Sequence, residues 1–92
     1  MKNIQIQKFY IIEDCDIQSG DNIITEDYEY TSSLKEAKQF TSYDEAKALI
    51  LQIDEYYNAQ VRGAFEINVD GEISHIYEVD LKEFLIDASD EI

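Results

Sequence analysis

The chain is organised around the stretch Ser42-Tyr-Asp-Glu-Ala-Lys-Ala-Leu-Ile-Leu-Gln-Ile-Asp-Glu-Tyr-Tyr-Asn58. Its apolar residues recur at three- and four-residue steps, the spacing of one helical face. They are Ala46, Leu49, Ile50, Ile53 and Tyr57. Ser42 is a good N-cap, and Glu45 three residues later completes a capping box with it. The pattern therefore predicts a helix over residues 42–58.

Strand patterns precede this helix. Over residues 3–13 the side chains alternate, with Phe9 and Ile11 on one face and Tyr10 and Ile12 on the other. A turn region follows, and residues 23–30 are predicted to form a second strand. Because a short connection joins the two strands, we expect them to pair as a hairpin.

Two further short helices are predicted. Ser33 and Glu36 repeat the capping-box pattern, which favours a helical turn ending near Phe40. In the tail, Leu81, Phe84 and Leu85 lie at helical spacing.

A second hairpin is predicted from residues 60–69 and 73–81, joined by Val69-Asp70-Gly71. A two-residue Asp70-Gly71 loop would mix large and small residues across each face, so we expect the three-residue loop with a bulge. The expected pairs are Ile67 with Ile73, Phe65 with His75, Gly63 with Tyr77, and Val61 with Val79. In this register Tyr77 covers Gly63, and Arg62 lies opposite Glu78.

The element order is therefore ββαββ, within one domain spanning residues 1–92. This order predicts an α+β fold in which a four-stranded antiparallel sheet packs on one main helix, with short extra helices. Proline is absent and glycine is scarce, so no linker is expected.

The net charge is the outlying property: 21 acidic residues stand against seven basic ones, giving −14. Such a charge repels nucleic acid and anionic membranes and attracts basic proteins. The chain has no apolar run of membrane-spanning length and no visible signal peptide. A single cysteine excludes an internal disulfide. We expect a cytoplasmic protein of a bacterial cell, as a monomer or small homo-oligomer.

Enzyme chemistry is not expected. His75 falls on the apolar face of a strand, and Cys15 lies between two aspartates that disfavour its thiolate. Asp14 and Asp16 begin an EF-hand-like spacing, but Ser19 stands where such a loop requires glycine. We therefore predict no catalytic residue, no metal and no cofactor.

The acids are distributed unevenly. From Phe9 to Leu34 there is no Lys or Arg, and Tyr28 and Tyr30 interleave the carboxylates. Exposed tyrosines among acids are typical of an interface. The alternative is that both tyrosines belong to the core. The predicted partner-binding residues are Asp14, Asp16, Asp21, Glu26, Asp27, Tyr28 and Glu29, with Glu66, Asp70, Glu72 and Asp80 as a second patch.

A family resemblance is carried by Phe9-Tyr-Ile-Ile12 and by Thr31-Ser-Ser-Leu-Lys-Glu-Ala-Lys-Gln-Phe-Thr-Ser-Tyr-Asp-Glu-Ala-Lys-Ala-Leu-Ile50. This half of the chain resembles small proteins of phages and mobile elements. The whole resembles anti-CRISPR proteins, which are short, acidic and without catalytic residues, and many of which act as DNA mimics. The resemblance implies an inhibitor that blocks nucleic-acid binding by a basic protein such as a Cas effector. The negative charge itself predicts no direct contact with nucleic acid or membrane.

The alternative to a charge-mimicking inhibitor is a small protein-interaction module, such as an antitoxin or host-takeover factor, whose acidity only keeps it soluble.

Overall fold

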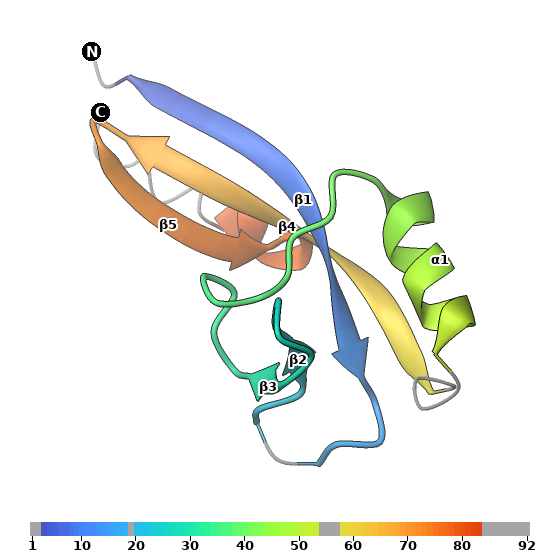
Figure 1. Ribbon diagram of the computed structural model, residues 1–92. Helices are drawn as coiled ribbons and strands as arrows, with labels where there is room; N and C mark the ends of the chain where they lie inside the picture. The colour runs from blue at the N-terminus through green and yellow to red at the C-terminus, as the bar shows by residue number, and fades with distance from the viewer. Residues whose placement is uncertain (1–2, 19, 54–57, 84–92) are drawn as a thin grey trace.

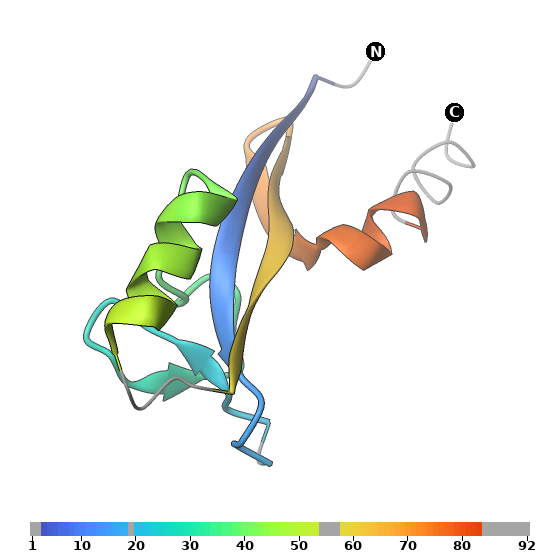
Figure 2. The same ribbon diagram turned by 90° about the vertical axis from the view of Figure 1, so that its right-hand side faces the viewer.

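The computed structural model describes residues 3–18, 20–53 and 58–83. These residues form an antiparallel sheet in the order β3-β2-β1-β4-β5, with helix α1 packed on one face (Figures 1 and 2). The elements are β1 (Ile4–Asp14), β2 (Ile23–Ile24), β3 (Tyr30–Thr31), α1 (Tyr43–Gln52), β4 (Ala59–Val69), β5 (Glu72–Tyr77) and the 3-10 helix η2 (Glu78–Asp80). The α+β class is confirmed, but the sheet has five strands where four were predicted.

The centre of the sheet is the long ladder between β1 and β4, which runs from the pair Ile4–Val69 to the pair Asp14–Ala59. Both faces of this ladder are covered toward its Asp14 end, as the alternation in β1 predicts, whereas Ile4 and Ile6 near the other end are exposed. One face holds a cluster of Phe9, Ile11, Ile23, Leu34, Ala37 and Ala64. The other face, under α1, holds Ile12, Ile24, Phe40, Ala46 and Ile50.

Helix α1 begins as predicted. The Ser42 hydroxyl accepts a 3.2 Å hydrogen bond from the backbone N–H of Glu45. The Glu45 carboxylate accepts a 2.9 Å hydrogen bond from the Thr41 hydroxyl. This bond takes the place of the second bond of a capping box, in which the carboxylate would accept the backbone N–H of Ser42. The helix ends at Gln52, because Ile53 is extended, and is therefore shorter than predicted. Residues 54–57, including the predicted contact Tyr57, lie outside the described residues.

The predicted register of the β4–β5 hairpin is wrong. Its loop has two residues, and the strands pair Ile67 with Ser74 and Phe65 with Ile76. Both loop residues are left-handed, with φ of 53° at Asp70 and 93° at Gly71. That is the backbone of a type I′ turn, whose twist matches the strands and which favours Asp-Gly. The preferred backbone of this turn therefore determines how the two strands pair. The large residues need not share one face, because either face of the sheet can be covered by other parts of the chain.

The end of this hairpin differs accordingly. Strand β5 stops at Tyr77, and Val79 lies exposed in η2, so its predicted pairing with Val61 is absent. Tyr77 pairs with Ala64 instead of covering Gly63. The carboxylate of Glu78 covers Gly63, and a Cβ atom at this position would overlap that carboxylate. Arg62, predicted to face Glu78, contacts Glu13.

The predicted strand over residues 23–30 is divided by a turn. Strand β2 pairs with β1 through Ile23 and Glu13, so the predicted hairpin exists in shortened form. The chain then turns back, with the Thr25 N–H donating to the Glu29 carbonyl at 3.0 Å, and β3 pairs with β2.

The predicted helix from Ser33 to Phe40 is also wrong, since this segment forms turns and isolated bridges. The Glu36 carboxylate accepts from the Thr31 hydroxyl at 2.9 Å and therefore does not cap Ser33. Leu34, Ala37 and Phe40 are nevertheless buried, as expected. In the predicted C-terminal helix, residues 81–83 are helical and residues 84–92 lie outside the described residues.

Candidate functional site

The turn between β2 and β3 presents three acids and one tyrosine at an edge of the sheet. We call Glu26, Asp27, Tyr28 and Glu29 the acidic tip. Two bonds close the turn: the Tyr28 N–H donates to the Thr25 carbonyl at 3.0 Å, and the Glu29 N–H donates to the Thr25 hydroxyl at 3.1 Å. All four residues of the acidic tip are exposed.

Tyr28 adopts a backbone conformation that is uncommon for its side chain. Its φ is 62°, in the left-handed region that glycine and asparagine favour. Its side chain gains little burial there, because Tyr28 is 52% exposed. Nothing in the sequence indicates this backbone, since tyrosine is among the residues least expected at such a position.

The charges of the acidic tip are partly compensated. Lys38 lies 3.1 Å from the Glu26 carboxylate and also 5.4 Å from the centre of the Phe40 ring. Asp27 and Glu29 form no ion pair with any residue that the structure describes. The tip therefore carries two uncompensated carboxylates beside its tyrosine.

Asp14 is a structural residue and does not face solvent. It is 4% exposed, and the Tyr30 hydroxyl donates a 2.7 Å hydrogen bond to one carboxylate oxygen. The other oxygen accepts the backbone N–H of Asp16 at 3.0 Å. Asp16 is exposed and accepts from the Asn58 side chain at 2.6 Å. Asp21 is exposed.

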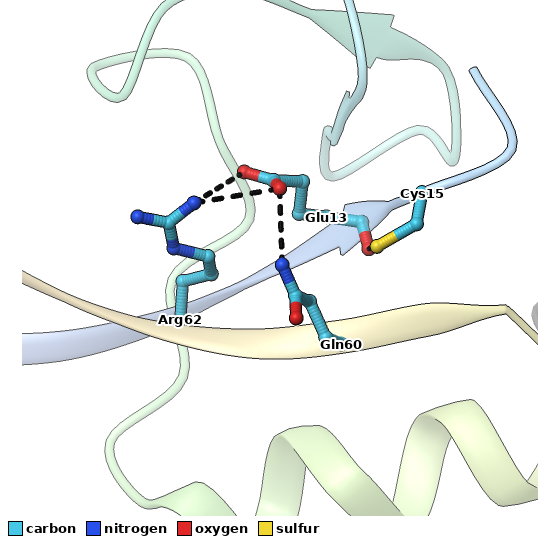
Figure 3. A network of polar contacts seen from close by, with 4 residues as sticks. All are labelled: Glu13, Cys15, Gln60 and Arg62. Carbon is cyan, nitrogen blue, oxygen red and sulfur yellow. Dashed lines mark hydrogen bonds and ion pairs between the residues drawn. The ribbon is translucent and has the colours of Figure 1, made fainter. Parts of the chain in front are cut away.

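Glu13 is also engaged within the fold (Figure 3). Its carboxylate accepts from Arg62 at 3.3 Å and from the Gln60 amide at 3.2 Å. The Arg62 guanidinium in turn lies 4.8 Å from the centre of the Tyr77 ring. The sequence has seven acids and no Lys or Arg between Phe9 and Leu34, but the fold supplies partners to several of these acids, including Arg62 and Lys38 from outside that stretch.

The second predicted patch does not form a cluster. Asp70 and Glu72 lie at the β4–β5 turn, whereas Asp80 lies in η2, beyond the other end of β5. Glu66 contacts His75 at 3.3 Å, and Asp70 accepts the Asn3 N–H at 3.0 Å. The β4–β5 turn lies at the Ile4–Val69 end of the β1–β4 ladder, whereas β2 pairs with β1 near the Asp14 end and runs back from there toward the β2–β3 turn (Figure 1).

Two residues considered for chemistry have ordinary surroundings. The His75 ring packs edge-on against Phe9, with 6.0 Å between ring centres. Cys15 is exposed. Within the described ranges, no group of three or more His, Cys, Asp or Glu side chains is arranged to hold a metal ion.

A groove of about 390 Å³, not predicted by any pattern in the sequence, lies between the turn at residues 32–35 and strand β5. The sequence gives no signal for it, because it arises where two segments about 40 positions apart meet.

No family model, curated protein or solved structure matches this chain. In the part of the chain that the structure describes, no helix has the length and apolarity needed to cross a membrane.

Proposed function

We propose that this chain is an inhibitor that binds a basic nucleic-acid-binding protein and occludes its nucleic-acid site by charge mimicry. The carboxylates of Asp21, Asp27 and Glu29 stand in for phosphates, and Tyr28 provides the central contact of the acidic tip. The resemblance to anti-CRISPR proteins makes a CRISPR effector in the bacterial cytoplasm the first target to test.

The observation that carries this proposal is the conformation of Tyr28. A left-handed backbone at a non-glycine residue costs about 1–2 kcal/mol. The exposed ring recovers little of that cost by burial, so the fold alone would be better served by glycine or asparagine. Such strain is found where an element is shaped for binding, and tyrosine gives large contact area at low entropic cost.

The electrostatics support the same surface. A net charge of −14 favours encounter with a basic groove and speeds association at low salt. Asp14 is withdrawn from the proposed interface because its carboxylate is buried. Glu26 contributes to the field, although Lys38 compensates part of its charge.

The test is capture from a bacterial lysate on the immobilised chain, with elution by a salt gradient and identification by mass spectrometry. The matched control is the triple variant Glu26→Gln, Asp27→Asn, Glu29→Gln, which keeps the size of each side chain. We expect the parent chain to retain a nucleic-acid-binding protein that salt elutes, that added DNA or RNA displaces, and that the triple variant does not retain.

The mimicry mechanism is wrong if the captured protein is retained equally by the triple variant, or if added nucleic acid and bound chain coexist on it. A purified CRISPR effector provides the direct assay. Labelled nucleic acid should leave the effector as the parent chain is added, and remain bound when the triple variant is added.

A second function is favoured by the internal partners of the acids. Because Glu13, Asp14 and Glu66 are held within the fold, part of the acidity is structural. In this reading the chain is a protein-interaction module that binds through Tyr28 without mimicking phosphate. The variant Tyr28→Asn would then abolish capture, whereas the triple acid variant would leave capture intact.

A further inference from the structure

Strand β5 forms the edge of the sheet opposite to β3, and therefore lies away from the acidic tip. Only β4 pairs with it among the described residues. An edge strand presents unpaired backbone donors and acceptors, to which another extended segment can pair.

The register identifies which backbone groups are free. Tyr10 exchanges both of its backbone hydrogen bonds with Phe40, so even-numbered residues of β1 point away from β4 and odd-numbered ones bond to it. Following the printed pairs across β4, Glu72, Ser74 and Ile76 bond inward. The N–H and C=O groups of Ile73, His75 and Tyr77 therefore point outward along the free edge.

The same three residues are among those that line the groove beside this edge, and the side chains of His75 and Tyr77 pack on the Phe9 face of the sheet. The groove is closed on its other side by the turn at residues 32–35, which contributes Leu34 and Lys35. Ile73 is 57% exposed, a large exposed area for an isoleucine in a strand. The free backbone groups and the apolar side chains that would contact an added strand thus coincide along one edge.

The charges around β5 specify the occupant. Asp70 and Glu72 lie at one end of the strand, and Glu78 and Asp80 follow its other end. Lys35 is the cation on the groove lining. A second copy of this chain would bring another −14 to the same edge, so self-pairing is opposed by repulsion.

We propose that β5 and its groove bind an extended segment of a partner protein in which apolar and basic residues alternate. The segment adds a sixth strand beside Ile73, His75 and Tyr77. Its apolar side chains enter the groove, and its basic side chains lie on the other face, near Glu72. This surface does not depend on the acidic tip or on the function proposed for it.

The test is NMR titration of the isotope-labelled full chain with an acetylated, amidated peptide of four alternating valine–lysine pairs. We expect amide shifts and slowed hydrogen exchange at Ile73, His75 and Tyr77. The variant Ile73→Lys should weaken binding by about tenfold, the effect of losing one anchor side chain and adding a like charge. Ile4→Lys is the matched control, since Ile4 is 41% exposed on another strand, and should leave the affinity unchanged.

Four outcomes overturn the proposal. One is the absence of peptide binding to a parent chain whose spectrum is folded. Another is binding that perturbs only the amides of the acidic tip, which would leave the proposed function standing and remove the β5 site. The third is perturbation of the β5 amides by raising the concentration of the chain alone, which would identify a second copy as the occupant. Equal binding of a valine–glutamate peptide would contradict the charge preference.

Discussion

The Tyr30 hydroxyl donates a 2.7 Å hydrogen bond to the buried carboxylate of Asp14, joining the end of β1 to β3. Tyr30→Phe removes this donor and leaves the carboxylate oxygen without it. A hydrogen bond to a charged group contributes about 1.5–3 kcal/mol, so we expect the free energy of unfolding in urea to fall by about 2 kcal/mol. Tyr43→Phe is the control, because Tyr43 is 50% exposed, and should change stability by less than about 0.5 kcal/mol. Equal stability of the two variants would contradict this role of Tyr30.

The two serines that begin capping-box patterns should respond differently to substitution. Ser42→Ala removes the acceptor for the Glu45 N–H and should cost about 1 kcal/mol. Ser33→Ala should cost little, because the bond at that turn is donated by the Ser33 backbone to the Thr31 hydroxyl. Urea unfolding of both variants gives the comparison. A larger loss of stability for Ser33→Ala than for Ser42→Ala would contradict the turn described for residues 31–37.

Gly63 and Glu78 should be energetically coupled. A methyl group at Gly63 overlaps the Glu78 carboxylate and would displace it from Lys8. Gly→Ala in a strand is otherwise favourable by about 0.5–1 kcal/mol. Gly63→Ala should therefore be nearly neutral in the parent chain and stabilising when Glu78→Ala is already present. A double-mutant cycle measures the coupling. Additive effects would show that the carboxylate moves aside without cost.

Stability should fall at alkaline pH. The hydrogen bond that Lys8 donates to the Glu78 carboxylate raises the pKa of Lys8 above its usual 10.5. Burial, together with the charge of Glu13, raises the pKa of Tyr77 above its usual 10.0. Both groups hold their protons more tightly in the folded chain, so their contribution is full below the unfolded pKa values and is lost as pH rises through the folded ones. The free energy of unfolding should be level near pH 8–9 and decline above about pH 10. The stability of Tyr77→Phe should decline less steeply over this pH range than that of the parent chain, and an equal slope would contradict the role of Tyr77.

Tyr28→Asn is expected to raise the stability of the fold and to weaken partner binding. Asparagine tolerates the left-handed backbone better than tyrosine, so we expect the variant to be more stable by roughly 0.5–1 kcal/mol in urea. Capture of the partner should weaken, because the exposed ring is removed. Tyr43→Asn, at a similarly exposed site in the first turn of α1, should retain capture. A Tyr28 variant that loses stability would remove the argument from strain.

The class of the fold, the N-cap of α1 and the two long strands follow from local patterns. Apolar spacing finds Ala46 and Ile50, and alternation assigns Phe9 and Ile12 to opposite faces. These features depend on neighbours within a few positions, which is why periodicity and capping chemistry identify them.

The misplaced features depend on competition between distant or alternative partners. Matching large residues across one face chose the wrong β4–β5 register, because the backbone preference of Asp70-Gly71 outweighs that match. The Glu36 carboxylate accepts a hydrogen bond from Thr31 and does not cap Ser33. The buried Asp14 carboxylate accepts a hydrogen bond from Tyr30. A list of acidic residues cannot distinguish buried, paired and exposed carboxylates, so the candidate site narrows to the acidic tip and Asp21 once the fold is known.

The β1–β4 ladder has a consequence for how the chain reaches its fold. Asp14 pairs with Ala59 and Ile4 with Val69, partners separated by 45 and 65 positions. During synthesis β1 is complete long before β4 exists, and non-local pairing of this kind is slow. An isoleucine-rich strand waiting for its partner is prone to pair with another chain. We expect the excess of carboxylates on each chain to oppose such pairing by like-charge repulsion until the ladder can close.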